Sequence, residues 1–268
     1  MPGETLQSES EGEANATAGW DASDWAWEFL RRNPDYHRDW LGAVPRVLPI
    51  LTLHDGTRFL RLRRRYPRAE AWGLFAFADP RVAARAAPVF WHPTALRRTV
   101  RARGADVPSH EDTVRPRLGD FGVGRSALAA GDGGATVLLK GNGTYVALAV
   151  RDLPAVALPI PLTFELDRLD DVGAHVDCLK TLQRFADPAK APAPASVFGT
   201  DDRLRHTLMA LDGFLAGKTY RQIAMTIFGE KRVAEEWAAG NESFKDRTRR
   251  LVARGRELMQ GGYRDLLR

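Results

Sequence analysis

Apolar residues recur at helical spacing close to the N-terminus. Asp24 can cap a helix over residues 25–32, and Pro34 ends that helix because the residue before a proline is pushed out of the helical conformation. Asn33 can then cap a second helix, with Pro34 in its first turn, that runs to about Leu41. The pattern predicts two short helices joined by a tight turn.

Tryptophan is concentrated in the same part of the chain. Six of the seven tryptophans fall before residue 92, namely Trp20, Trp25, Trp27, Trp40, Trp72 and Trp91. Large aromatic side chains pack together when they are buried, so the concentration predicts a small aromatic core with short strands near residues 71–77 and 89–91. An aromatic cage for a ligand is the alternative; we expect the packed core.

The middle of the chain carries strand patterns. Two β-rich runs, residues 135–140 and 144–151, flank a Gly-Asn-Gly turn at residues 141–143, where asparagine and glycine tolerate a positive φ. These runs predict a hairpin. A third apolar run, residues 156–166, contains two prolines that cannot donate a ladder hydrogen bond, so it is at most an edge strand.

A helical stripe follows the hairpin, along a helix that ends near Phe185. Its apolar residues recur at three- and four-residue intervals, at Leu169, Val172, Val176, Leu179 and Leu182. A dimer contact is one use of such a stripe, but it covers only about two heptads, too few for a coiled coil. We expect it to pack against the hairpin.

These patterns predict an α+β protein with a segmented chain. The first segment lacks basic side chains and apolar bulk, so we expect disorder there. Gly, Pro and charge dominate the predicted linker, and proline stiffens the predicted connector, which would act as a hinge. The segments are an acidic tail (1–19), a Trp-rich N-terminal domain (20–102), a linker (103–134), a hairpin plus helix (135–186), a Pro-rich connector (187–199) and a helical C-terminal domain (200–268).

The C-terminal segment begins with two well-punctuated helices. The first, about residues 201–216, is capped by Thr200 or Asp201, and Gly217 ends it. Its buried face is expected at Leu204, Leu208, Leu211 and Leu215. The second helix opens with a capping box, Thr219 to Gln222. Its apolar stripe is Tyr220, Ile223, Ala224, Ile227 and Phe228, with Ala224 small enough for a close helix crossing.

The last helix is strongly basic. It opens at Ser243, with Asp246 completing a second capping box, and is expected to bury Phe244, Thr248, Leu251, Gly255 and Leu258. Between Ser243 and Arg256 six basic residues accompany one acid. The second and last helices resemble a helix-turn-helix, in which arginines of the recognition helix pair with guanine in the major groove. The predicted DNA-binding residues are Ser243, Lys245, Arg247, Arg249, Arg250, Arg254, Thr219 and Arg221.

Two features leave alternatives open. A basic helix on its own is equally compatible with a solvated surface, and the helix-turn-helix pattern is what favours DNA. Residues 229–242 also exceed the turn of about 3–4 residues that the motif normally has. We expect a short extra helix there, with Val233 and Trp237 packed inward, and the insertion bears on how the last helix docks.

Two further arginine clusters lie in the N-terminal half. They are Arg58, Arg61, Arg63, Arg64, Arg65 and Arg68, and then Arg97, Arg98, Arg101 and Arg103. Each cluster taken alone is expected to be a solvated surface or, for the second, part of a flexible joint. Auxiliary contact with phosphates is the functional alternative, since neutralised phosphates release counterions.

Composition sets the outer limits. The 268 residues carry a net charge of +5, which suits a polyanionic partner. Cys178 is the single cysteine, so neither an intramolecular disulfide nor a cysteine-based zinc site is possible. With no membrane-length apolar run and no export signal, we expect a cytoplasmic, nucleoid-associated protein. Scattered histidines and the lack of a nucleophile motif predict that it is not an enzyme and needs no cofactor.

The C-terminal motifs resemble a proteobacterial domain found in the FseA and QseM regulators. They are Tyr220–Ala224, Ile227–Gly229, Trp237, Ser243–Leu251 and Gly255–Leu267. Trp25–Tyr36 and Ala78–Trp91 look like the domain that precedes it in FseA-type activators. The second and last helices also look like region 4 of sigma factors.

The resemblance implies a transcriptional activator that binds promoter DNA, activates an excisionase promoter and so promotes excision and conjugative transfer of an integrative element. RNA polymerase and an antiactivator protein are further implied partners. QseM-like members instead act as antiactivators that bind another regulator. Since this chain carries both halves, it resembles the activators more closely.

Overall fold

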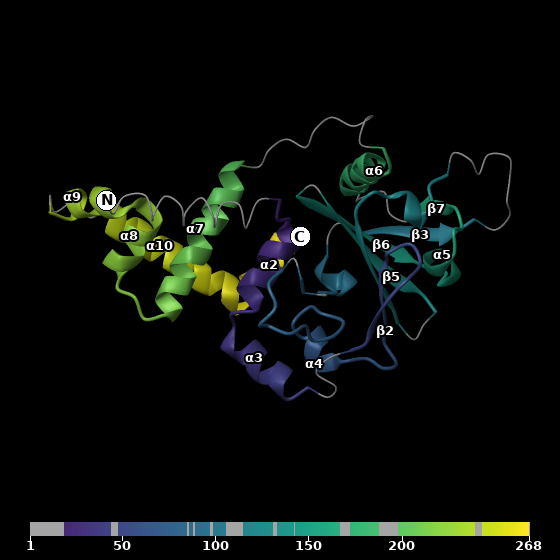
Figure 1. Ribbon diagram of the computed structural model, residues 1–268, viewed down its shortest axis with the longest axis horizontal. Helices are drawn as coiled ribbons and strands as arrows, with labels where there is room; N and C mark the ends of the chain where they lie inside the picture. Colours follow the sequence, from purple (N-terminus) through teal and green to yellow (C-terminus); the bar gives the residue numbers. More distant parts are fainter. Residues whose placement is uncertain are drawn as a thin grey trace.

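A computed structural model describes residues 19–43, 48–84, 86–87, 89–96, 99–105, 115–130, 133–141, 143–166, 172–187, 198–238 and 243–267. Its α+β class is the one predicted. A mixed sheet forms one end of the molecule, and a helical module made of α7 to α10 forms the other (Figure 1). The helices α2 and α3 lie between them.

The sheet has seven strands in the order β1-β2-β4-β5-β6-β3-β7. Parallel pairing joins β2 to β4 and β3 to β6, and the other neighbours are antiparallel. The predicted hairpin is confirmed as β5 and β6, and the third run forms an edge strand, as predicted. The strands are β1 (Ile50–Thr52), β2 (Arg58–Arg61), β3 (Thr99–Gly104), β4 (Gly124–Ala129), β5 (Ala135–Gly141), β6 (Thr144–Val150) and β7 (Leu162–Glu165).

The predicted linker is wrong over residues 124–129. This stretch is β4, which pairs with β5 on one side and β2 on the other, and its Ala127 and Leu128 are fully buried. The arginine-rich residues 99–104, considered for a flexible joint, form β3. A strand joined to distant partners needs no strong local signal, because its neighbours supply its hydrogen bonds. Part of the linker, residues 106–114, lies outside the described residues.

Helix α6 (Val172–Ala186) covers one face of the sheet, together with the short α5 (Pro154–Ala157). Cys178, Leu182 and Phe185 make the buried contact. The predicted stripe is therefore wrong in part: Leu182 is buried, but Val172, Val176 and Leu179 are among the exposed large apolar side chains. Leu169 lies outside the described residues. The face that packs is rotated away from the sequence stripe.

The opposite face of the sheet meets an aromatic core. Trp25 and Trp27 of α2 (Ala22–Leu30) are buried there with Trp91, in the same cluster as Leu138 and Tyr145 of the sheet. Edge-to-face contacts join Trp27 to Tyr36 and Tyr36 to Trp72. The expected aromatic core is present.

The caps of the first two helices differ in how well they were predicted. In α2 the N-cap is Asp21, and Asp24 is the third helical residue that completes its capping box. In α3 (Pro34–Leu41) the N-cap is Asn33, as predicted. The expected strands near residues 71–77 and 89–91 are wrong, because the described residues there make only the isolated bridge between Leu74 and Trp91.

Short elements surround this core. They are α4 (Pro67–Glu70), the 3-10 turns η1 (Pro93–Ala95) and η3 (Leu118–Asp120), and the two terminal segments η5 (Leu258–Gly262) and α11 (Arg264–Leu267). In η5 the chain forms a π-type turn with Gly261 at φ 145°. The turn lets the chain after α10 bend back onto α2, where Leu258, Tyr263 and Leu267 are buried in the aromatic core.

Candidate nucleic-acid interface

The helical module is built around α7 (Phe198–Leu215). Two glycines permit close crossings of this helix. A Cβ on Gly255 of α10 would lie 2.9 Å from Leu211 Cβ and 3.0 Å from the Thr207 carbonyl oxygen. A Cβ on Gly213 would lie 2.8 Å from Ile223 Cγ1 of α8. The sequence pointed to Ala224 for a close crossing; Ala224 is fully buried, but glycines make the closest approaches.

Helix α8 (Tyr220–Phe228) begins with the predicted capping box. Thr219 Oγ1 accepts from Gln222 N at 3.3 Å, and Gln222 Oε1 accepts from Thr219 N at 2.9 Å. Its stripe is correct at Ile223 and Ala224, which are buried, but Tyr220 is 40% exposed. Leu215 on α7 is likewise exposed. In both helices, the residue of the predicted stripe that lies nearest the α7–α8 turn is therefore not buried.

The insertion between α8 and the last helix contains the predicted extra helix, α9 (Glu230–Ala238). Gly229, at φ 92°, makes the turn between α8 and α9 in a conformation that favours glycine. Val233 is fully buried against Ala224 and Phe244, as expected. The side chain of Trp237 and residues 239–242 lie outside the described part.

The last helix, α10 (Ser243–Glu257), separates a buried face from a charged one. Phe244, Thr248, Gly255 and Leu258 are buried as predicted, and Val252 joins them. Arg249, Arg250 and Asp246 lie on the outward face, opposite the contact with α7. Asp246 forms an ion pair with Arg249 at 3.6 Å, and its backbone oxygen accepts a hydrogen bond from Arg250 Nε at 3.4 Å.

Several arginines of the module lie over aromatic rings. Arg247 lies over Phe228 at 4.7 Å from the ring centroid, and Arg256 over Phe214 at 5.2 Å. Arg232 of α9 lies over Phe244, which itself stacks on Phe228 at 4.9 Å. These contacts hold part of the basic surface in place, which reduces the entropy lost when a phosphate binds. Arg232 was not among the sequence candidates, because only the fold brings α9 beside Phe244.

Nearby, His206 of α7 lies 6.1 Å from the Phe228 ring. Burial, with Arg205 as the next cause and Arg247 as a smaller one, lowers the pKa of His206 below its ordinary value. At neutral pH the imidazole is therefore uncharged, and it adds no positive charge to the basic surface.

The predicted DNA-binding residues fall into two groups. The C-terminal end of α8 meets the start of α10, since Phe228 stacks on Phe244, whereas Ile223 packs with Leu251 and Val252. The two helices therefore run in opposite directions. Thr219 and Arg221 are exposed at the start of α8, so they lie toward the C-terminal half of α10 and away from its start at Ser243. Arg254 pairs with Glu257 at 2.8 Å.

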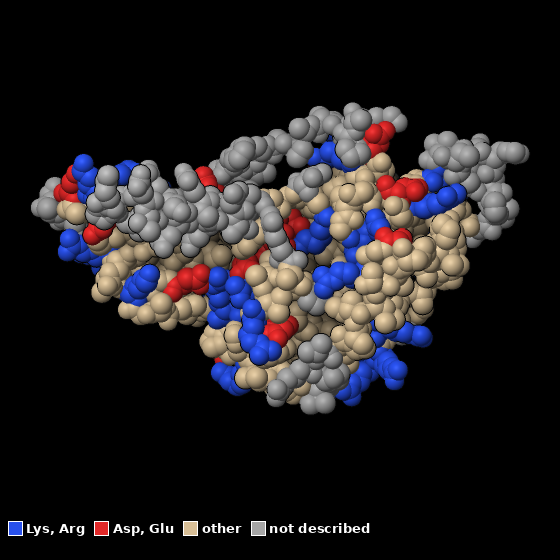
Figure 2. All heavy atoms as spheres, in the orientation of Figure 1, with Lys and Arg blue, Asp and Glu red and all other residues tan. Residues whose placement is uncertain are grey.

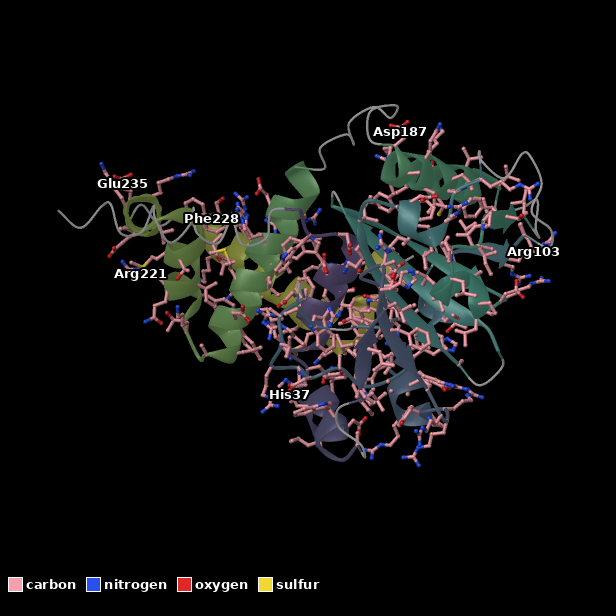
Figure 3. The ribbon with its side chains drawn as sticks, turned by 45° about the vertical axis from the view of Figure 1, so that its right-hand side comes forward. His37, Arg103, Asp187, Arg221, Phe228 and Glu235 are labelled. Carbon is pink, nitrogen blue, oxygen red and sulfur yellow. The ribbon has the colours of Figure 1, made fainter. Side chains whose placement is uncertain are left out.

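Charged side chains are scattered over the visible face of the molecule, with basic residues at both the helical end and the sheet end (Figure 2). Arg221 and Glu235 extend from the outer end of the helical module, and Arg103 lies at the opposite end beside the sheet (Figure 3). Among the described residues, no cluster of histidine, cysteine and acidic side chains could hold a metal ion. None of the described helices is both long and apolar enough to cross a membrane.

DNA-binding proteins commonly present an outward arginine-rich helix on a helical module, and this module has that arrangement. The comparison with protein families agrees. Residues 160–268 match the family model described as "T6SS, Transcription factor, DNA binding domain". Residues 7–75 match the "Proteobacterial transcriptional regulator-like domain". No curated protein matches the chain. The chain is a transcription regulator with a DNA-binding domain.

The C-terminal match begins at residue 160 and so includes β7 and α6 as well as the helical module. The N-terminal match includes α2, α3 and the first two strands. Both matched segments contribute to the aromatic core, through Trp25 and Trp27 from one and Leu211 and Tyr263 from the other.

Proposed function

We propose that this protein activates transcription by inserting α10 into the major groove of promoter DNA. The observation that carries the proposal is the outward face of α10, where Arg249 and Arg250 are exposed while Gly255 packs closely on α7 and Phe244 packs on α8 and α9. Arginine pairs bidentately with guanine, and a helix anchored on its other face can hold that geometry. Ser243, Lys245, Arg247, Arg254, Thr219 and Arg221 supply the flanking contacts.

The test is a binding titration of the full chain with a labelled promoter fragment at several salt concentrations. Each arginine-to-phosphate contact contributes about one unit to the salt slope, and each good base contact about 1–3 kcal/mol. We expect the double change Arg249→Ala and Arg250→Ala to weaken binding at least tenfold. Arg38→Ala serves as the control for the loss of an exposed arginine outside α10, because the Arg38 side chain is 75% exposed on α3. Unchanged affinity of the double variant would exclude α10 as the reading helix.

Two classes of promoter are candidates for the DNA that this protein binds. The FseA-like resemblance favours an excisionase promoter, and with it excision and transfer of an integrative and conjugative element. The family match of the C-terminal segment favours a promoter of type VI secretion genes instead. Chromatin immunoprecipitation followed by footprinting separates the two. Occupancy of neither promoter class would remove both targets and leave the DNA-binding role to be tested on its own.

A protein-binding role is the second candidate function, and a surface feature of the module favours it. Phe214, Leu215 and Tyr220 are all exposed around the α7–α8 turn. If the protein is an antiactivator, it would bind another regulator through these apolar residues. If it is an activator, RNA polymerase or an antiactivator would bind to the same residues. Leu215→Asp with Tyr220→Ala should abolish capture of the cognate regulator and leave DNA affinity intact. A chain that captures the regulator and shows no salt-dependent DNA binding is the antiactivator.

We further propose that the protein acts without a cofactor and without catalysis of its own, in the cytoplasm and on the nucleoid. A fluorescent fusion that follows the DNA stain, and loses that pattern in the Arg249→Ala and Arg250→Ala variant, supports this location. A fusion spread evenly through the cell in both forms contradicts it.

A further inference from the structure

Two adjoining cavities lie on the sheet half of the molecule, away from the helical module. Each has a volume of about 330 Å³, and both are lined by Phe75, His92 and Ala130. We call the combined depression the sheet groove. Its first part also has Arg101 and Arg151 in its lining, and its second part has Arg63, Arg64 and Arg65.

The floor of the first part is a single row of residues across four strands. Register pairs Leu128 of β4 with Thr136 of β5, Thr136 with Ala149 of β6, and Ala149 with Arg101 of β3. Neighbouring strands are about 4.8 Å apart, so these four side chains stand side by side on one face. The two middle residues are short, which leaves a hollow between Leu128 and Arg101.

The wall of the groove is fixed by its own contacts. The His92 ring lies 4.8 Å from the Phe75 ring, and His92 Nδ1 is 2.7 Å from Thr94 Oγ1. On the backbone, His92 N donates to Gly73 O at 2.8 Å and Phe75 N donates to Phe90 O at 2.9 Å. Two rings held in this way can receive a third flat ring without reorganising.

The lining carries an excess of positive charge. Five arginines line the groove, and its one lining carboxylate, Glu70, already accepts from Arg65 Nε at 3.0 Å; outside the lining, Glu165 pairs with Arg151 at 3.4 Å. The hydrogen bond from Arg65 lowers the pKa of Glu70, so this group stays ionised within the pair. Burial lowers the pKa of His92, which is therefore neutral at pH 7 and able to stack as an uncharged ring. Arginine is the side chain best suited to bind phosphate oxygens.

We propose that the sheet groove is a binding site for a phosphate-bearing ligand of mononucleotide size, with its ring against Phe75 and His92 and its phosphate among the arginines. Pockets for small ligands typically have volumes of about 300–1,000 Å³, and the groove lies in this range. The same phosphate chemistry is offered by a free nucleotide and by the backbone of DNA bound along the molecule. The site does not depend on α10 as the reading helix.

Isothermal titration calorimetry of the full chain with AMP tests the free-ligand source. Adenosine, which lacks the phosphate, and ribose 5-phosphate, which lacks the base, serve as comparison probes. We expect AMP to bind, and each fragment to bind at least tenfold more weakly. Arg63→Ala and Arg101→Ala remove one arginine from each part of the groove, and each should weaken AMP at least tenfold. Ala149→Leu fills the hollow and should have the same effect. The control Arg38→Ala should leave AMP affinity unchanged.

The salt slope of promoter binding tests the DNA source with the same variants. If the phosphate belongs to DNA, Arg63→Ala or Arg101→Ala lowers the slope by about one unit and AMP does not bind. AMP binding supports the whole proposal, whereas the DNA result supports the phosphate site among the arginines and overturns the ring contact with Phe75 and His92. If AMP does not bind and both slopes equal that of the unmodified chain, the proposal is overturned. Arg249→Ala with Arg250→Ala, tested in parallel, reports separately on α10. Circular dichroism confirms that each arginine variant is folded.

Discussion

Gly255 sets the distance between α10 and α7. A methyl group at this position would come within 2.9 Å of Leu211 Cβ and 3.0 Å of a backbone oxygen that has little freedom to move. We therefore expect Gly255→Ala to force the helices apart and cost about 1–3 kcal/mol, although alanine is the better helix former. Urea unfolding measures the loss, and DNA affinity should fall with it because α10 shifts.

Gly173 in α6 offers a matched control. It is also helical, and a Cβ there meets nothing within 4 Å. Gly173→Ala should leave the stability unchanged or raise it by up to about 1 kcal/mol. A Gly255→Ala variant that gains as much as Gly173→Ala would show that the close crossing has no energetic consequence.

Glu28 is a charged residue held inside the N-terminal half. Its carboxylate is 1% exposed and accepts from Arg31 Nε at 2.6 Å, Arg32 Nη1 at 2.6 Å and Ala84 N at 2.8 Å. Burial by itself raises the pKa of Glu28, but these hydrogen bonds outweigh it and hold the pKa below 4.5. Glu28→Ala would take one carboxylate partner from Arg31 and Arg32, although Arg32 keeps its ion pair with Asp212, and we expect a loss of about 3 kcal/mol at neutral pH.

The pH dependence of this loss has a definite sign. A carboxylate with a depressed pKa in the folded state stabilises the protein above its ordinary pKa and loses that effect as the pH falls through the folded value. The difference in unfolding free energy between the parent chain and Glu28→Ala should therefore shrink below about pH 4.5. A difference that is constant from neutral to acid pH would mean that packing, and not charge, accounts for the loss.

At the scale of elements, local signals explain which predictions succeeded. Asn33, Thr219 and the Gly-Asn-Gly turn act on residues next to them in the chain, so α3, α8 and the hairpin could be predicted from sequence. By contrast, β2 and β4 are joined in parallel by residues 68 positions apart, as in the pair Arg58 and Ser126. Arginine content obscured β2, and glycine content obscured β4. Each strand forms because its neighbours in the sheet provide its hydrogen-bond partners.

The stripe on α6 shows how a correct period gives a wrong face. Val176 and Leu179 follow the helical repeat, but so do Cys178, Thr181 and Phe185 on the next face around the helix. The sheet selects the second set, in which Thr181 satisfies its hydroxyl on the Asp177 carbonyl at 2.9 Å. Periodicity alone gives no preference between two such sets. Val176 and Leu179 of the first set therefore stay exposed on α6.

The same limit applies to the candidate DNA-binding set. Its basic residues on α10 could be found because charge and helical spacing are local. The whole candidate set forms two groups, one from the start of α10 and one at the start of α8, because the two helices pack antiparallel. The sequence does not encode this packing locally. The aromatic partners of Arg247 and Arg256 come from α8 and α7, and each contact depends on the tertiary fold.

At the scale of the whole molecule, the C-terminal segment is bound firmly to the N-terminal half. Asn33 Nδ2 donates to Met259 O at 2.9 Å, and Tyr145 Oη donates to Leu267 O at 3.1 Å. Arg32 forms a two-bonded ion pair with Asp212 of α7. A proline-rich hinge was predicted at residues 187–199, of which 188–197 lie outside the described part. The described residues of the two halves share one aromatic core.

Two buried tyrosines, one from each half, provide a test of this shared core. Tyr263 Oη donates to Trp72 O at 2.8 Å, and Tyr36 Oη donates to Ala78 O at 2.8 Å; both side chains are fully buried. Burial raises the pKa of Tyr263 to about 12 and also raises the pKa of Tyr36 above the ordinary value of 10. In the unfolded chain both phenols ionise from about pH 10, so the stability from their neutral forms is lost as the pH rises above 10.

We expect the two halves to unfold together between about pH 10 and pH 12, since Tyr263 alone contributes about 2 kcal/mol across that interval. Tyrosinate absorbance at 295 nm and near-ultraviolet circular dichroism should change in one coincident transition. Tyr263→Phe loses the bond to Trp72 O and costs about 1 kcal/mol at pH 7, but its disadvantage should disappear by about pH 11. Tyr220→Phe, at an exposed phenol, should leave the transition in place. Two separate transitions would show that the DNA-binding module and the N-terminal half are energetically independent, because a core shared by both cannot open in one half alone.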